Sequence, residues 1–263
     1  MMYNQQSILE LAKRGQRLDG RALTEYRQPI LITRNISKTA EGSARVQIGD
    51  TVIMAGVKLA IEKPYNDTPD EGGIMVNAEL TPMSNPNFEP GPPGIDAVEL
   101  ARVIDRGIRE AKAIDMKQLC LVPGEKAWFV TIDLITVNVA GNLFDAAGLA
   151  ALAALKSAFF PVSDPETGVI DYKQKTNKAL PLLKEPLPVT VFKIGGSLFL
   201  DVTLEEEKAA EARLTISSDP DGTISALQKG GTAPLTLEDI ERMVDLATEK
   251  AAFLRKELNR TIA

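Results

Sequence analysis

Alternating apolar and polar residues over 127–139 predict a β-strand, because successive strand side chains point to opposite faces. Trp128, Val130, Ile132 and Leu134 share one face, which we expect to be buried. Pairs of strands are predicted where apolar runs flank turn residues such as Gly49-Asp50. The predicted strand segments are 44–60, 72–82, 127–139, 187–203 and 212–231.

Helical periodicity separates these strands. An amphipathic pattern covers 7–14, a longer one covers 97–113, and an alanine-rich helix opens from the turn at 141 and runs to 155. The last predicted helix runs from Thr236 to about Leu258, with Thr236 and Asp239 placed as a capping pair.

This order of elements predicts an α+β fold, since each half of the chain has several strands followed by a long helix. The polar, proline-bounded segment 163–186 is interpreted as a linker. It would join an N-terminal half, 20–162, to a C-terminal half, 187–263, within a single domain spanning 1–263.

Composition narrows the chemistry. The chain has 263 residues with 36 acidic and 30 basic side chains, so its net charge of −6 gives no bulk attraction to nucleic acid or anionic membranes. One cysteine, Cys120, excludes an internal disulfide, and the absence of histidine excludes histidine general bases and imidazole metal sites. Any chemistry of this chain must therefore use carboxylates, lysine, arginine or the backbone.

The N-terminal residues lack the order of a secretory signal peptide. The longest apolar run, 146–155, is shorter than the roughly 18 residues of a membrane span. We therefore expect a cytoplasmic protein that does not associate with membranes.

The helix predicted over 97–113 carries three arginines, Arg102, Arg106 and Arg109, on the face opposite its apolar residues. Guanidinium groups in such a stripe can grip successive phosphates. The alternative is an ordinary solvated face, because Glu99, Asp105 and Glu110 stand three or four residues from the arginines.

Two further features bear on chemistry. Asp201 ends a predicted strand and is followed by an acidic run containing Glu205, Glu206, Glu207 and Glu211, which we interpret as a solvated loop or a site for a divalent cation. Asp145 is predicted to be the N-cap of the alanine-rich helix, where its carboxylate would compete with a bound phosphate. No Lys or Arg lies between Gly141 and Leu155 to clamp such a phosphate.

Taken in order, several segments make the chain resemble the RNase PH family, in particular the non-catalytic ring subunits of archaeal exosomes. The segments are QRLDGRALTEYR (16–27), EGSARVQIGDTVIMAGVK (41–58), NAELTPMSNPNFEPGPPGIDAVELARVIDRGIRE (77–110), LDVTLEEEKAAEARLTI (200–216) and ISALQKGG (224–231).

The resemblance implies the RNase PH fold, with two β-rich halves of ribosomal-protein-like βαβ topology, each with packed helices. It further implies a hexameric ring of three heterodimers with a homologous catalytic subunit, and cap proteins with OB-fold and KH domains. Single-stranded RNA entering the ring would be shortened from its 3′ end by phosphate.

Catalytic members of the family have Gly, then Ser or Thr, then Arg at the helix start matched to 146–148, where this chain has Ala-Ala-Gly. At the family's three aspartate positions it has Asp201, Glu207 and Arg213, which makes general acid catalysis doubtful and leaves metal binding by Asp201 and Glu207 open. Arg102 and Arg106 match RNA-contacting positions of the resembled subunits, whereas the role of Arg109 stays open.

The preferred hypothesis is therefore a non-catalytic RNA-binding subunit with no catalytic residues, no metal and no cofactor of its own, phosphate and Mg being used by the partner. The alternative is an active phosphorolytic 3′-to-5′ exoribonuclease or nucleotidyltransferase that uses Asp201 and Glu207. A third hypothesis is a purely architectural protein whose helix arginines only form surface ion pairs.

Overall fold

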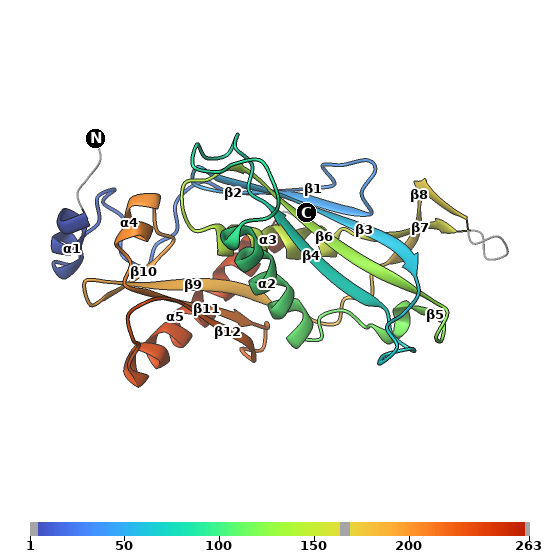
Figure 1. Ribbon diagram of the computed structural model, residues 1–263. Coiled ribbons are helices and arrows are strands. Elements are labelled where there is room, and N and C mark those ends of the chain that lie inside the picture. Colours follow the sequence, from blue (N-terminus) through green and yellow to red (C-terminus); the bar gives the residue numbers. More distant parts are fainter. Residues whose placement is uncertain (1–4, 164–168, 261–263) are drawn as a thin grey trace.

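A computed structural model describes residues 5–163 and 169–260 of the chain. It contains two main sheets with helices packed between and around them (Figure 1). The helices are α1 (Gln5–Lys13), α2 (Ile95–Glu110), α3 (Leu143–Lys156), α4 (Leu204–Ala209) and α5 (Leu237–Arg260), with a 3-10 turn η1 at Lys117–Leu119. None of them is long and apolar enough to cross a membrane, within the part of the chain just given.

The first sheet has the strand order β1-β2-β3-β6-β4, with β5 pairing the start of β6. Its strands are β1 (Ile30–Arg34), β2 (Gly42–Ile48), β3 (Thr51–Glu62), β4 (Gly73–Glu79), β5 (Cys120–Val122) and β6 (Lys126–Asn138). Only β4 and β6 run parallel, and α2 lies in the connection between them. This is the βαβ unit expected for the first half.

The second sheet has the order β10-β9-β11-β12, and its neighbouring strands are all antiparallel. The strands are β9 (Leu187–Ile194), β10 (Ser197–Leu200), β11 (Ala212–Ser218) and β12 (Ile224–Gly231). Because β10 and β11 both run antiparallel to β9, they are parallel to each other, and α4 joins them. The second half thus contains a split βαβ unit, with β9 inserted between its two strands.

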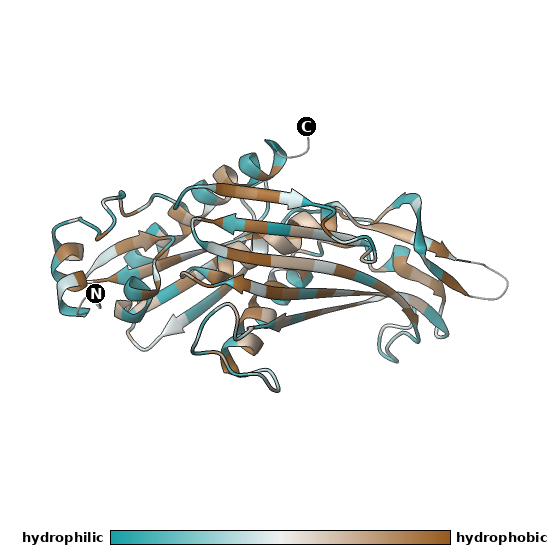
Figure 2. Ribbon diagram, turned by 90° about the horizontal axis from the view of Figure 1, so that it is seen from above, coloured by the Kyte–Doolittle hydropathy of each residue, from teal (hydrophilic) through white to brown (hydrophobic). Residues whose placement is uncertain are grey.

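Helix α3 is the centre of the molecule (Figure 1). Residues Phe144 to Leu155 are all buried, and the helix packs against β2 and β3 on one side and β9 on the other. Its alanines suit this position because small side chains let the helix approach both sheets. Figure 2 shows hydrophobic positions running along the long strands of the first sheet.

Most predicted elements are confirmed. Trp128, Val130, Ile132 and Leu134 of β6 are all buried, and the Gly49-Asp50 turn joins β2 to β3. The capping pair at the start of α5 is also present: Asp239 N–H donates to Thr236 Oγ1 at 3.1 Å, and Thr236 N–H donates to Asp239 Oδ2 at 2.9 Å.

Two segments differ from prediction. The segment 163–186, interpreted as a linker, contains strand β8 (Ile170–Ala179), which pairs with β7 (Phe159–Ser163) in a separate two-stranded sheet. Strand β8 is mostly polar on both faces, with only Ile170, Tyr172 and Ala179 as exceptions, so its sequence lacks sustained apolar alternation. The acidic run after Asp201, interpreted as a loop, includes helix α4, whose capping box joins Thr203 and Glu206.

Candidate functional site

The side chains of Arg102 and Arg106 lie on the exposed face of α2. The opposite face packs into the core through Leu100, Val103, Ile104 and Ile108. Neither arginine makes an ion pair or side-chain hydrogen bond with another residue in the ranges 5–163 and 169–260. The structure therefore leaves two cations one helical turn apart and unneutralised.

Two of the three acidic neighbours of these arginines, Asp105 and Glu99, have other partners. Asp105 accepts two hydrogen bonds from Arg109, from Nε at 3.0 Å and from Nη2 at 2.7 Å. Glu99 pairs instead with Arg213 of β11, with Oε1 and Nη2 separated by 2.6 Å. Of the three arginines, Arg109 forms the intrahelical ion pair that the solvated-face alternative expects, and the RNA role of Arg102 and Arg106 stays a prediction.

The start of α3 differs from prediction in register. The N-cap is Asn142, in the left-handed region at φ 53°, and the helix begins at Leu143. Asp145 is therefore not the N-cap. Its buried carboxylate accepts hydrogen bonds from Tyr26 Oη at 2.6 Å, from Asn142 Nδ2 at 3.0 Å and from the Thr190 backbone N–H at 2.7 Å.

Local capping rules placed Asp145 wrongly because two of its partners come from distant segments. Ala146, Ala147 and Gly148 lie beyond the start of the helix and are buried. The first residues of α3, Leu143 and Phe144, carry neither a hydroxyl nor a guanidinium group. The guanidinium of Arg27, from a distant segment, does reach this turn and donates to the carbonyl oxygens of Ala140 and Gly141.

Gly148 lies where α3 meets β9. A Cβ atom at this position would overlap the ring of Pro188. We expect Gly148→Ala to lower the free energy of unfolding by about 1–3 kcal/mol, because overpacking displaces neighbouring backbone and side chains. Urea denaturation would measure the change, with Gly56→Ala as control because a Cβ there meets no atom within 4 Å. Equal effects of the two substitutions would contradict this account.

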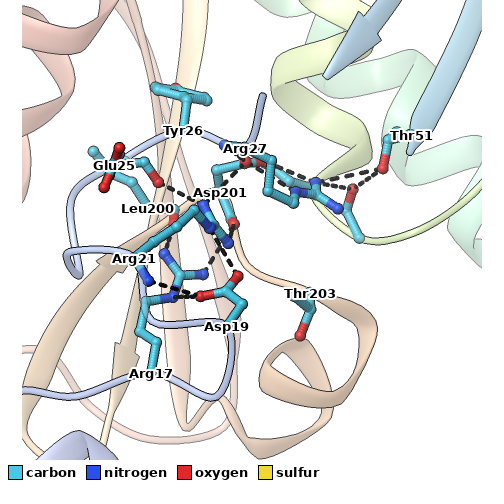
Figure 3. A network of polar contacts seen from close by, with 12 residues as sticks. Arg17, Asp19, Arg21, Glu25, Tyr26, Arg27, Thr51, Leu200, Asp201 and Thr203 are labelled. Atoms are coloured by element: carbon cyan, nitrogen blue, oxygen red, sulfur yellow. Dashed lines mark hydrogen bonds and ion pairs between the residues drawn. The ribbon is translucent and has the colours of Figure 1, made fainter. Parts of the chain in front are cut away.

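Asp201 is fully buried and is surrounded by arginine groups (Figure 3). Arg27 forms a two-pronged pair with its carboxylate, from Nε to Oδ2 at 2.9 Å and from Nη2 to Oδ1 at 2.8 Å. Arg27 N–H donates to Oδ2 at 2.6 Å, and Asn142 Nδ2 donates to Oδ1 at 3.1 Å. Arg21 Nη1 lies 3.4 Å from Oδ2. Both oxygens of the Asp201 carboxylate therefore accept hydrogen bonds that hold the fold together.

The two neighbouring glutamates, Glu206 and Glu207, differ in their surroundings. Glu206 is buried and accepts a hydrogen bond from Arg17 Nε at 2.9 Å. Burial raises the pKa of Glu207, while the positive charges of Arg213 and Arg27 act in the opposite direction. Within residues 5–163 and 169–260, no three His, Cys, Asp or Glu side chains are grouped so as to hold a metal ion.

Arg17, Arg21 and Arg27 hold the fold together around Asp201, a role that was not predicted from the sequence. All three come from the segment 16–27, which precedes the first strand, and Figure 3 shows them converging on the chain around Asp201. The available signal was three arginines within eleven residues in a segment without apolar periodicity. The carboxylate partners of Arg17 and Arg27, Glu206 and Asp201, lie in the other half of the chain, whereas Arg21 pairs with the nearby Asp19 at 2.7 Å.

Comparisons with known proteins show which family has this architecture. Residues 25–161 match domain 1 of the 3′ exoribonuclease family, RNase PH, and residues 184–250 match its domain 2. The chain is 44% identical over 256 residues to the exosome complex component Rrp42 of Methanothermobacter thermautotrophicus, covering 97% of this chain and 94% of that protein. It is 47% identical over 251 residues to the Rrp42 of Methanocella arvoryzae, covering 95% and 94%.

Two solved exosome structures contain chains with the same fold. The fold superposes with a TM-score of 0.87 on a chain of the Archaeoglobus fulgidus exosome with RNA bound to the active site, at 38% identity and covering 96% of each chain. An archaeal exosome core gives a TM-score of 0.85 at 36% identity, covering 97% of this chain and 96% of that one. With both family domains matched and the βαβ unit of each half in place, the chain belongs to the RNase PH family of 3′ exoribonucleases.

Proposed function

We propose that this chain is a non-catalytic subunit of an archaeal-type exosome, and that it binds single-stranded RNA through Arg102 and Arg106. The observation that carries the proposal is the pair of exposed arginines without an acidic partner on α2. The relatives named as exosome components, similar over nearly the full length, support the assembly context.

The lack of catalysis rests on two features of the fold. The first turns of α3 carry no Lys or Arg to hold an attacking phosphate, and the nearby Arg27 and Arg213 are paired with Asp201 and Glu99. Asp201 is in turn neutralised by Arg27. Without a held nucleophile, an anionic phosphate would have to approach an anionic phosphodiester unaided. The chemistry therefore belongs to a homologous catalytic RNase-PH-like partner, which uses phosphate and Mg.

In the proposed assembly, three heterodimers form a hexameric ring in the cytoplasm, and cap proteins with OB-fold and KH domains bring RNA to it. The two arginines contact phosphates beside the active site of the partner. Such contacts fix RNA in place without reading its sequence. The net charge of −6 suits a subunit whose RNA-binding face is local.

We expect Arg102→Gln with Arg106→Gln to weaken RNA binding by the reconstituted complex about tenfold at moderate salt. Two lost phosphate contacts should also reduce the slope of log affinity against log salt by about 1.4. Fluorescence anisotropy with a labelled oligoadenylate of about twelve nucleotides would measure both quantities.

The matched control is Arg14→Gln with Arg242→Gln, which removes two exposed positive charges elsewhere. Affinity that falls equally in both double variants would contradict a local site. The absence of catalysis has its own test, in which the purified chain alone is incubated with RNA and phosphate. Release of nucleoside diphosphates would show that the chain is itself a phosphorolytic enzyme.

A further inference from the structure

The exposed face of α2 carries more charges than its two unpaired arginines. Glu99 lies three residues before Arg102 and seven before Arg106, so all three share one face of the helix. A glutamate placed N-terminal to a cation at this spacing ordinarily pairs with it. Here the Glu99 carboxylate is instead held at 2.6 Å by Arg213, which comes from the second sheet.

Arg213 lies in a slot that suits its planar group. Its guanidinium carbon is 4.6 Å from the centre of the Phe144 ring, at the start of α3. Gly230 is its cross-strand partner on β12, and a Cβ atom at that position would overlap the guanidinium group. An aromatic ring and a position without a side chain thus direct Arg213 toward Glu99.

The second acid on this helix, Asp105, is also paired with an arginine other than Arg102 and Arg106. Asp105 lies three residues after Arg102 and next to Arg106, yet both of its oxygens accept hydrogen bonds from Arg109. Arg109 and Arg213 thus neutralise Asp105 and Glu99, and Arg102 and Arg106 keep their charge. A third acid, Glu110, lies four residues after Arg106 and forms no ion pair within the described residues.

We propose that Arg213 is a positioning residue that withholds Glu99 from Arg102 and Arg106 and so keeps both cations available for RNA phosphates. This inference rests on the proposed function. Arg213 acts from a site that is distant in sequence and ties the second sheet to the RNA-binding helix. Arg109 has the same role toward Asp105, over a shorter distance.

The test combines charge removal with rescue. We expect Arg213→Gln to lower the affinity of the reconstituted complex for the labelled oligoadenylate about fivefold, because the released Glu99 then competes for Arg102. Adding Glu99→Gln to that variant should restore affinity to the starting value. Glu99→Gln alone should leave affinity unchanged or higher.

Rescue by Glu99→Gln distinguishes the positioning role of Arg213 from direct RNA contact and from a purely structural role. If Arg213 itself touches RNA, or only supports the fold beside Glu207, then Glu99→Gln cannot restore binding, and the inference is overturned. Gly230→Ala provides a second variant that keeps every charge but fills the slot, and it should weaken binding in the same direction as Arg213→Gln. Unchanged affinity in both Gly230→Ala and Arg213→Gln would also overturn the inference.

The double variant of Arg102 and Arg106 tests the proposed function independently of Arg213. If Arg102→Gln with Arg106→Gln leaves affinity unchanged, the proposed RNA site itself fails. If that double variant loses affinity while the Arg213 and Glu99 variants do not, RNA binding stands and only the positioning role is wrong. Salt titrations of all variants show whether the lost affinity is electrostatic.

Discussion

Arg27→Met is expected to lower the free energy of unfolding by about 3–5 kcal/mol, because it leaves the buried Asp201 carboxylate without its main partner. Arg27 also donates to the carbonyl oxygens of Ala140 at 2.6 Å and Gly141 at 3.0 Å. It therefore joins the N-terminal segment to the turn before α3 and to the end of β10. Burial acts to lower the pKa of Arg27, but the hydrogen bonds with Asp201 and the negative charges of Asp201, Glu206 and Asp50 together raise it above its ordinary value.

A double variant separates the buried charge from the lost packing. Arg27→Met with Asp201→Asn removes both charges and should recover much of the lost stability, since breaking a buried pair costs more than replacing it. Asparagine suits position 201, where φ is 46°, because it tolerates the left-handed region. Denaturant unfolding measures each variant.

The control for Arg27 is an exposed pair of the same type. Arg109→Met breaks the pair with Asp105, in which the Arg109 side chain is 50% exposed, and should change stability by about 1 kcal/mol or less. A loss for Arg27→Met no larger than this would show that Asp201 does not depend on Arg27.

Periodicity predicted the fold well where one face of an element is buried. Strand β6 and helix α5 follow this rule, because burial of one face imposes the pattern on the sequence. Strand β8 was not predicted because it is mostly polar on both faces. Helix α4 was not predicted because its six residues are too few to show a period. Its capping box, Thr203 with Glu206, was the usable signal.

The geometry of the candidate site was predicted in part, and its role stays a prediction. Local spacing placed Arg102 and Arg106 on one exposed face, but it could not tell which acids would pair with them. Glu99 is held by Arg213, more than a hundred residues away in the chain. Asp145 and Asp201 likewise owe their surroundings to segments brought together only by the fold, so their roles could not be derived from neighbouring residues.

Asp145 is expected to make the protein less stable as pH rises toward neutrality. Burial raises the pKa of Asp145 from 3.8 to about 7, although hydrogen bonds from Tyr26, Asn142 and Thr190 oppose this, and the Asp201 charge raises it further. The folded protein thus keeps a proton that the unfolded chain releases near pH 4. The resulting stabilisation is complete below about pH 4 and is lost as pH rises through about 7.

A pKa difference of this size corresponds to a change on the order of 4 kcal/mol across that interval. Asp145→Asn cannot ionise, so its free energy of unfolding should gain on the natural protein by an amount of that order between about pH 4 and pH 8. Altered hydrogen bonds add an offset to the variant that does not vary with pH. Urea unfolding at a series of pH values measures the difference.

Tyr26→Phe tests the cause of this dependence. It removes the hydroxyl whose hydrogen bond lowers the pKa of Asp145, so the loss of stability should move to higher pH. Profiles of the natural protein and Asp145→Asn that run parallel from about pH 4 to pH 8 would mean that Asp145 is ionised in the fold throughout. The joint between Tyr26, α3 and β9 would then hold two buried negative charges, Asp145 and Asp201, linked through the amide of Asn142.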